Sequence, residues 1–209
     1  MELKKAIMER VSIRRYLPTP VPREDLEHIL NMAILGPSAG NAQMWHFIVI
    51  TKSLLIKELA GAVNKKAMEM MSLPEMDEFK KYMETIRAYS SFFEQAPALI
   101  AVLMKPYHSM TEKILSRQKI PPEESLKMRG FPGIQSIGAA IQNLLLAAWD
   151  LGYGTCWMTG PLFAKKELEK ILEIKKPDEL VALIPVGRPA ETPAPRPRKP
   201  LSEVSTWIE

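Results

Sequence analysis

Cysteine and histidine are scarce in this chain of 209 residues. The single cysteine, Cys156, excludes an intramolecular disulfide and a zinc site built from several cysteines. The three histidines, His28, His46 and His108, are far apart in sequence and show no metal-ligand spacing. We therefore expect no metal ion, and we expect Cys156 to be a buried small side chain rather than a nucleophile.

Long hydrophobic runs and several common catalytic motifs are also missing. The apolar stretches 96–104 and 134–149 are shorter than the ~20 residues of a membrane-spanning helix, and the N-terminus has no apolar signal region. The sequence has no GxxxxGK[S/T], GxGxxG, HExxH or CxxC pattern. We expect a cytoplasmic protein without membrane contact, and P-loop, Rossmann and zinc-peptidase chemistries are excluded.

A strong charge of one sign is absent as well. The 28 lysines and arginines only slightly outnumber the 24 acidic residues, which leaves a net charge of +4. Most basic residues are interspersed with acidic ones, whereas nucleic-acid-binding proteins gather them on one face. We therefore expect no nucleic-acid partner. Two stretches, 10–15 and 196–199, are locally basic.

The apolar pattern predicts one domain of helices and strands without internal repeats. Pro22 stands at a predicted first helical position, Ser53 is a predicted helix cap, and Pro185 is expected to end the last core element. The stretch 107–130 is polar, has no dominant period and is expected to be a mobile excursion. Helices are predicted over 3–10, 22–36, 53–70, 73–94, 134–151 and 165–172, and strands over 45–51, 98–104, 152–158 and 179–187.

Two segments predict contact with a second subunit. The helix 134–151 is apolar around its whole circumference, which is typical of a central core helix or of one packed against a partner. The segment 188–200 is too rich in proline for a helix or an inner strand, so it should run extended over a surface. It is followed by Val204, Trp207 and Ile208, whose apolar surface needs a docking site, and we expect that site on a neighbouring chain.

The segment RVSIRRY at 10–16 predicts an anion site. If the chain is extended here, Arg10, Ser12 and Arg14 point to the same side. Arginine forks bind phosphate with two parallel hydrogen bonds, and a serine hydroxyl adds a neutral donor. The alternative is a solvated basic turn. Arg196 and Arg198 alternate in the same way on the proline-rich segment.

Four motifs in this order resemble the FMN-dependent nitroreductase family, from about residue 3 to residue 204. RVSIRRY is similar to the family's opening phosphate-binding motif, and GPSAGNAQMWHFIVI resembles its Pro-Ser-x-x-Asn loop and the strand that follows. IGAAIQNLLLAAWDLGYGTCWMTG resembles the long interface helix with its flavin strand, and IPVGRP with PRPRKPLSEV resembles the last core strand and the basic arm. Val11, Met44 and the pair Gln135 and Ser136 depart from the usual residues, which leaves the choice of substrate open.

The resemblance implies an α+β fold, in which a central mixed, mainly antiparallel sheet is covered by helices on both faces as a three-layer α/β/α sandwich. It implies an intertwined homodimer with two FMN molecules in its interface. Residues 1–187 would form one FMN-binding domain, with a variable lid over about 72–130. Residues 188–209 would be an extended C-terminal arm that docks on the partner subunit.

The resemblance also implies the residues of the cofactor site. Arg10, Ser12 and Arg14 would hold the phosphate and ribityl chain of FMN, with Arg196 and Arg198 closing on the same region. A loop of the partner subunit would contribute Pro37, Ser38, Asn41 and Gln43. Backbone amides of Met158, Thr159 and Gly160 would lie along the isoalloxazine ring, near N5 and O4.

The implied activity is oxidoreduction with NADH or NADPH as electron donor. A hydride would pass through flavin N5 to a flat small-molecule acceptor such as a nitroaromatic or a quinone, with ping-pong kinetics and without a catalytic side chain. A second hypothesis within the same fold is a specialised flavin enzyme that fragments flavin, removes halogens or acts as a biosynthetic dehydrogenase. A third hypothesis is a module that binds FMN without turnover.

Overall fold

The computed structural model describes residues 2–209, apart from the side chains of Glu75 and Met76. Four strands form one sheet in the order β1-β2-β4-β3, so β2 and β4 are the inner strands. All three ladders between these strands are antiparallel, and one isolated parallel bridge joins Ser12 to Thr155. The strands are β1 (Trp45–Ile50), β2 (Ala98–Met104), β3 (Gly154–Thr155) and β4 (Glu179–Gly187).

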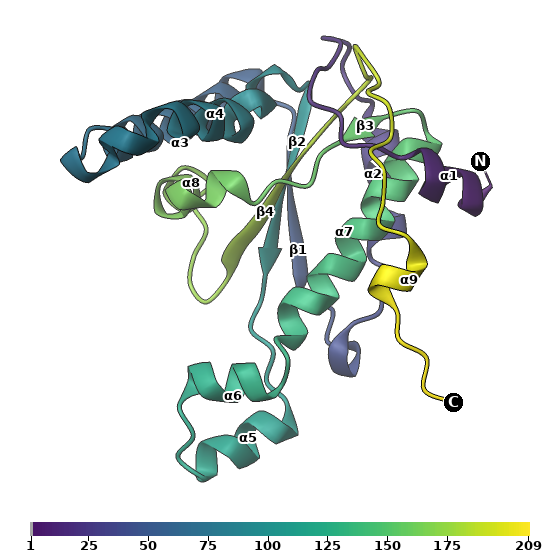
Figure 1. Ribbon diagram of the computed structural model, residues 1–209, viewed down its shortest axis with the longest axis vertical. Coiled ribbons are helices and arrows are strands. Elements are labelled where there is room, and N and C mark those ends of the chain that lie inside the picture. The colour runs from purple at the N-terminus through teal and green to yellow at the C-terminus, as the bar shows by residue number, and fades with distance from the viewer. Residues whose placement is uncertain (1) are drawn as a thin grey trace.

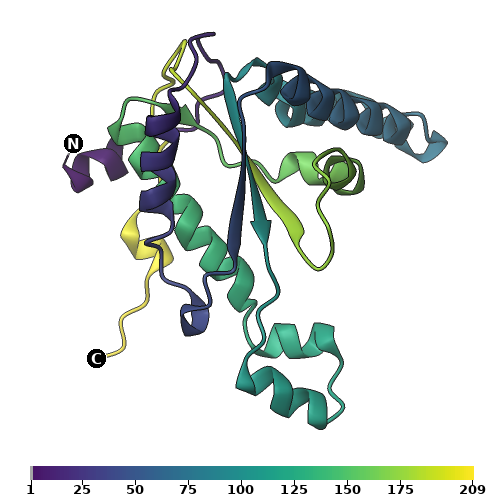
Figure 2. The same ribbon diagram turned by 180° about the vertical axis from the view of Figure 1, so that it is seen from behind.

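Helices cover both faces of this sheet (Figures 1 and 2). The α-helices are α1 (Leu3–Glu9), α2 (Arg23–Ala33), α3 (Ser53–Met71), α4 (Lys80–Ser91), α5 (Met110–Arg117), α6 (Pro122–Met128), α7 (Pro132–Asp150), α8 (Lys165–Ile171) and α9 (Leu201–Val204). Short 3-10 helices are η1 (Ala39–Asn41), η2 (Pro74–Phe79), η3 (Phe92–Gln95) and η4 (Gly160–Ala164). The expected three-layer α+β architecture is confirmed.

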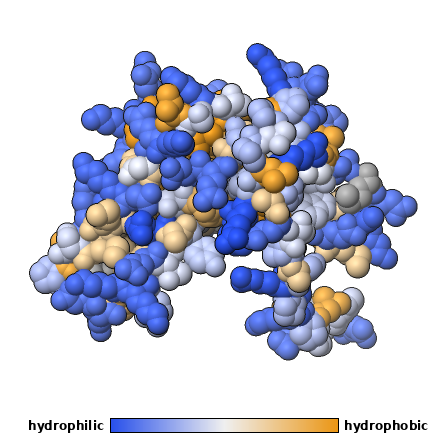
Figure 3. Space-filling view, turned by 90° about the horizontal axis from the view of Figure 1, so that it is seen from above, coloured by the Kyte–Doolittle hydropathy of each residue, from blue (hydrophilic) through white to orange (hydrophobic). Residues whose placement is uncertain are grey.

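Strand β2 separates the two main parts of the core. Its side chains alternate, so Ile100 and Val102 pack with α2 and α7, while Leu99 and Leu103 pack with α3 and α8. Because β2 is buried on both faces, its sequence is a continuous apolar run rather than an alternating one. The end of the molecule seen from above in Figure 3 is largely hydrophilic, with separate hydrophobic patches.

Several helices begin, divide or end at residues other than the predicted ones. Ser53 is the first residue of α3 rather than its cap, and Pro22 caps α2 instead of opening it. The stretch 73–94 divides into η2, α4 and η3. Gly152, with φ +77°, follows the end of α7 as predicted for a residue in the left-handed region.

The two last predicted strands also differ in extent. The strand predicted over 152–158 is only the two residues of β3, followed by a bridge between Met158 and Leu183. Pro185 does not end the core, because β4 stays buried to Gly187. The N–H of Leu183 points toward Met158, so the missing N–H of Pro185, two residues further, faces the same side. Pro185 therefore costs no hydrogen bond to β2.

The polar stretch 107–130 is helical, contrary to expectation. It forms α5 and α6, a hairpin that projects beyond one end of the sheet (Figure 1). Each helix has eight residues or fewer, too short for an apolar period to stand out. A capping box between Ser109 and Glu112 begins α5. β2 lies in the middle of the range 72–130, so this range is interrupted by an inner strand. Its role as a lid stays a prediction.

Candidate cofactor site

The segment from Arg10 to Tyr16 runs extended along β3. The backbone N–H of Ile13 donates to the carbonyl of Thr155 at 2.9 Å, and the Ile13 side chain is fully buried. Gly154 permits this contact, because a Cβ there would lie 2.4 Å from the Ile13 side chain. Ile13 therefore points inward and anchors the segment. Ser12 and Arg14 on either side of it line a cavity at the surface.

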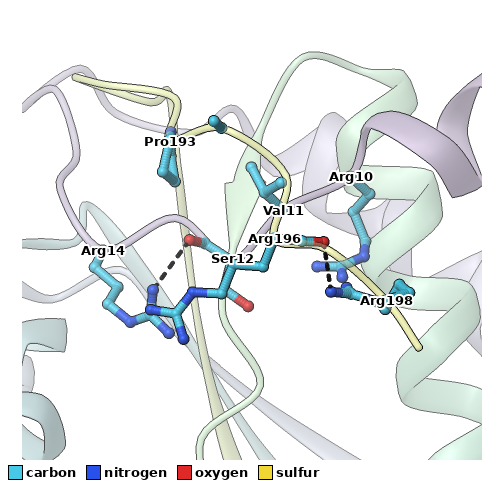
Figure 4. A pocket seen from close by; sticks show the side chains of 8 residues that line it. Arg10, Val11, Ser12, Arg14, Pro193, Arg196 and Arg198 are labelled. Atoms are coloured by element: carbon cyan, nitrogen blue, oxygen red, sulfur yellow. Dashed lines mark hydrogen bonds between the residues drawn. The ribbon is translucent and has the colours of Figure 1, made fainter.

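Four arginines surround that cavity, which has a volume of about 250 Å³ (Figure 4). We call it the four-arginine cavity. Arg10 and Arg14 come from the N-terminal segment, and Arg196 and Arg198 come from the C-terminal arm, together with Pro193. Arg10 and Arg198 lie beside each other, and Arg14 lies on the other side of Ser12 (Figure 4). Segments almost two hundred residues apart in sequence thus form one site.

These guanidinium groups are not neutralised by the chain. None of the four has a carboxylate within 4.0 Å in residues 2–209. Their hydrogen bonds go to backbone carbonyls: Arg14 donates to Ser12 at 3.5 Å, and Arg198 donates to Arg196 at 3.0 Å. Burial lowers the pKa of the Arg10 guanidinium, and the neighbouring charge of Arg198 lowers it further. An anion in this cavity would relieve both the repulsion and the missing hydrogen bonds.

The segment 156–160, which follows β3, leads away from this cavity. Met158 is buried and exchanges two backbone hydrogen bonds of 3.0 Å with Leu183. Thr159 and Gly160 are exposed, and no acceptor among residues 2–209 receives a hydrogen bond from the backbone N–H of Thr159. Gly160 lies against α4, because a Cβ there would be 2.8 Å from Ser90 Oγ. The backbone N–H of Thr159, which has no acceptor in residues 2–209, therefore lies next to the end of α4.

One side chain near the four-arginine cavity, Tyr89, was not predicted from the sequence as part of the site. Tyr89 of α4 lies under Arg14, with the guanidinium carbon 5.5 Å from the ring centre. Tyr82, Ile86 and Tyr89 are all exposed and recur at helical spacing, a signal that could have marked this face of α4. Cys156 is buried near Ser12, and burial raises the pKa of its thiol, so it fits the expected small core side chain.

The loop with the remaining predicted residues lies elsewhere in the chain. Pro37, Asn41 and Gln43 are exposed, while Ser38 is half-buried and accepts from the Gln43 backbone N–H at 3.1 Å. Asn41 and Gln43 have φ values of +52° and +48°, and the hydrogen bond from the Gln43 side chain to Asn41 Oδ1 spans this tight turn. The loop is thus a compact, preformed polar surface.

This loop and the four-arginine cavity stand at opposite ends of α7. The backbone N–H of Ala39 donates to Ser136 Oγ near the start of α7, whereas Ile13 packs on Gly154, just after the helix ends. The helix from Ser136 to Asp150 spans about 20 Å at its usual rise per residue. One chain therefore does not bring the loop and the four-arginine cavity together, and the ribbon in Figure 2 shows the loop and the N-terminal segment well apart.

The loop also carries a Gly-x-Ser-x-Gly pattern at 36–40, which serine hydrolases use for their nucleophile. That arrangement needs a strand before the serine and a helix after it. Here α2 precedes Ser38 and a single 3-10 turn follows it. Gly36 instead allows α2 to approach α7, because its Cβ would lie 2.9 Å from the backbone nitrogen of Ala140. The pattern does not form a hydrolase site.

Residues 2–209 contain no group of three or more His, Cys, Asp or Glu side chains placed to hold a metal ion. In the same residues, no helix has the length and apolar character needed to cross a membrane.

Comparisons with known proteins agree on one family. The sequence profile of the nitroreductase family matches residues 7–188. The chain is similar to a putative NADH dehydrogenase/NAD(P)H nitroreductase of Methanothermobacter thermautotrophicus, with 32% identity over 94% of this chain and 82% of that one.

Solved structures show the same fold. A BluB-like flavoprotein from Clostridium difficile 630 aligns over the full length of both chains, with a TM-score of 0.89 and 33% identity. A nitroreductase with bound FMN from Desulfitobacterium hafniense covers 99% of this chain and 97% of its own, with a TM-score of 0.73 and 22% identity.

Proposed function

Because the chain belongs to the nitroreductase family, we propose that it is an FMN-dependent oxidoreductase that takes electrons from NADH or NADPH. Its acceptor would be a flat small molecule such as a nitroaromatic or a quinone. The observation that carries the proposal is the four-arginine cavity, which has four cationic side chains and no acidic one in its lining. A doubly charged phosphate, such as the one on FMN, matches this set of donors.

Each part of the site has a separate proposed role. Arg10 and Arg14 hold the phosphate from two sides, Ser12 donates from its hydroxyl, and Arg196 with Arg198 closes the cavity from the arm. Met158, Thr159 and Gly160 would hold the ring of the cofactor, and the backbone N–H of Thr159, which has no acceptor among residues 2–209, would be available to donate to it. FMN held by these residues would supply the hydride-transfer chemistry between donor and acceptor. No catalytic side chain is required.

The rest of the cofactor site is proposed to come from a second copy of the chain. Pro37, Ser38, Asn41 and Gln43 are about 20 Å along α7 from the arginines of their own chain, so a partner packed antiparallel along α7 would supply them. The arm residues Leu201, Val204, Trp207 and Ile208 are 62–96% exposed, as expected for side chains that dock on a partner. In this proposal, residues 1–187 form the FMN-binding domain and 188–209 the docking arm.

The absorption spectrum of the purified protein tests the proposal. We expect a flavin spectrum that bleaches when NADH or NADPH is added without oxygen and recovers when a nitroaromatic or quinone follows. A flavin spectrum that neither donor bleaches would support the FMN-binding module instead. Bleaching without recovery by any acceptor of a panel would support a specialised flavin enzyme. A colourless protein that takes up no added FMN would contradict the proposal.

The subunit arrangement is tested by mixing two defective variants. Arg10→Ala/Arg14→Ala removes the phosphate side of the site, and Ser38→Ala/Asn41→Ala removes the loop side. A mixed dimer contains one intact site if the two sides come from different chains, so co-expression should restore bound FMN to half of the sites in that dimer. Restoration to none of them, with both variants folded, would place both sides in one chain.

A further inference from the structure

Arg129 is a nearly buried cation with few partners. It follows α6, and its side chain is only 10% exposed. An arginine side chain carries several N–H donors, yet the only hydrogen bond that the Arg129 side chain forms within the described residues goes from Nη1 to Ser109 Oγ at 3.4 Å. Its Nε is buried without a partner among the described residues. Such an unsatisfied buried charge is costly unless something else binds it.

The nearest carboxylate does not satisfy Arg129. Glu112 Oε1 lies 3.8 Å from Arg129 Nη2, which is an ion-pair distance but too long for a hydrogen bond. Glu112 Oε2 accepts from the Ser109 backbone N–H at 3.3 Å and lies 3.4 Å from His108 Nδ1. One helical turn before Arg129, the hydroxyl of Ser125 is also buried without a partner among the described residues. Two such polar groups thus lie near the C-terminal end of α6.

Arg129 lines a cavity of about 250 Å³ between the α5–α6 hairpin and the start of α7. We call it the Arg129 cavity. Its apolar wall is formed by Met104, Pro106, Pro122, Leu126, Phe131 and Ile134. Its charged lining includes Lys105, Arg129 and Glu112, so the two positive charges of Lys105 and Arg129 face the one negative charge of Glu112. The remaining charge of +1 and the apolar wall match a singly charged anion with an apolar body.

The backbone around this cavity is held in an unusual shape. Gly130 and Phe131 have φ values of +68° and +55°, and a left-handed conformation is rare for a bulky residue such as Phe131. This conformation places Phe131 in the cavity wall immediately before α7, whose first backbone N–H groups have no helical partner. The positive end of the α7 dipole therefore adds to the potential of Arg129 and Lys105.

The Arg129 cavity also touches the loop that is proposed to face the flavin of the partner. Tyr107 lines the cavity, and its hydroxyl lies 3.0 Å from where a Cβ of Gly40 would be. Gly40 stands between Ser38 and Asn41, in the loop assigned to the cofactor. A ligand of the Arg129 cavity would therefore lie beside that loop. This contact between the Arg129 cavity and the loop is an observation separate from the geometry of the four-arginine cavity.

We propose that the Arg129 cavity binds the carboxylate of an aromatic acid and that the acceptor of this enzyme is such an acid with a nitro or quinone group on its ring. That group would be reduced with the two electrons that NADH or NADPH supplies, while the carboxylate stays unchanged. The inference rests on the proposed function, because the loop places the cavity beside the flavin only in the proposed dimer. The guanidinium of Arg129 pairs with the carboxylate through its Nη atoms, and the ring packs on Leu126, Phe131 and Ile134. A dianion such as phosphate is disfavoured by the carboxylate of Glu112.

The first test is titration of the flavin-loaded protein with benzoate and with its neutral analogue benzamide. Benzoate should bind, and benzamide should bind at least about tenfold more weakly, since it lacks the charge-assisted hydrogen bonds. In Arg129→Gln the affinity for benzoate should fall about tenfold or more, whereas Arg117→Gln, an exposed arginine on the same hairpin, should not change it. Lys105→Gln gives a second readout if Arg129→Gln does not fold, with a loss of several-fold.

The second test compares 4-nitrobenzoate with 4-nitrobenzamide as electron acceptors. The ratio of their kcat/KM values should favour the acid, and Arg129→Gln should lower this ratio about tenfold or more, mainly through KM. An unchanged ratio, or wild-type protein that does not bind benzoate at all, would overturn the inference. The proposed function fails separately: a protein that binds benzoate through Arg129 but retains no FMN contradicts the flavin assignment and leaves the Arg129 cavity as an acid-binding site.

Discussion

The four-arginine cavity and the Arg129 cavity have similar volumes but differ in how the backbone builds them. The four-arginine cavity is made by two extended segments, where alternate residues face the same side. The Arg129 cavity is made by short helices packed against the start of α7, where a single arginine is buried by tertiary contacts. Extended arginines are placed by local geometry, whereas Arg129 is placed only by the packing of α6. The first site is therefore visible in the sequence, and the second is not.

The largest expected effect is the loss of the two N-terminal arginines. In Arg10→Ala/Arg14→Ala the affinity for FMN should fall by about 100-fold or more, because two charge-assisted contacts to the phosphate are removed. The ratio of flavin to protein after gel filtration measures the loss. The double substitution Arg23→Ala/Arg117→Ala removes two exposed arginines and should keep the flavin. Full flavin occupancy in the first variant would show that these arginines do not hold the cofactor.

The anchoring of the N-terminal segment gives the next largest effect. In Gly154→Ala the new methyl group would overlap Ile13, so we expect a loss of about 1–3 kcal/mol in unfolding free energy together with weaker flavin binding. Gly61→Ala is the matched control, since nothing lies within 4 Å of a Cβ there, and it should stabilise α3 by about 0.5–1 kcal/mol. Urea denaturation distinguishes them. Equal effects of both substitutions would mean that Ile13 is not fixed as the structure shows.

The arm should contribute less than the N-terminal segment, because Arg196 and Arg198 are exposed. In Arg196→Ala/Arg198→Ala we expect FMN affinity to fall about three- to tenfold. The loss should shrink as salt is raised, since exposed charges are screened. Flavin fluorescence titrations at low and high ionic strength measure this. A loss as large as that of Arg10→Ala/Arg14→Ala, independent of salt, would contradict the division of roles.

The smallest effect is expected at an ion pair, where a cation of the chain, unlike the four arginines, has a carboxylate as its partner. Lys165 donates a 2.8 Å hydrogen bond to Glu179 and lowers the pKa of that carboxyl group. Because the folded pKa is lower, the pair stabilises the protein above the usual carboxyl pKa and the contribution disappears as pH falls through the folded pKa. Glu179→Gln should therefore cost less than about 1 kcal/mol at pH 7, since Glu179 is 43% exposed.

The pH dependence of that cost is the decisive part. Urea denaturation at pH 7 and at about pH 3 should show the cost of Glu179→Gln falling toward zero at the lower pH. Glu58→Gln, at an exposed position of α3 without an ion pair in the described chain, should cost little at either pH. An equal cost for Glu179→Gln at both values would mean that the carboxylate charge does not matter.

Most of the architecture could be predicted because its signals are long. The apolar run of β2 and the apolar circumference of α7 extend over whole elements, and both lie where expected. The short helices α5 and α6 could not be recognised by period, although the Ser109 and Glu112 capping box was a local sign of α5. β3 is short because the chain after Thr155 leaves the ladder and bridges to Leu183 at Met158, a detail of sheet geometry that no local pattern encodes.

The candidate site likewise has one part that the sequence predicts and another that only the packing of the helices determines. The alternation of Arg10, Ser12 and Arg14 predicted one side of a cavity, and the structure brings this side together with Arg196 and Arg198. Their role in holding FMN stays a prediction. Tyr89 joins the site through the position of α4, which depends on packing rather than on local pattern. Arg129 is hidden for the same reason, since a charged residue near a helix end is usually solvated.

The most direct test of the cofactor assignment is to measure the dissociation constants of FMN and of riboflavin, which lacks the phosphate, for the same protein. If the four-arginine cavity holds the phosphate, the wild-type protein should bind FMN about 100-fold or more tightly than riboflavin. In Arg10→Ala/Arg14→Ala most of that difference should disappear. Equal affinities for FMN and riboflavin in the wild-type protein would contradict the account.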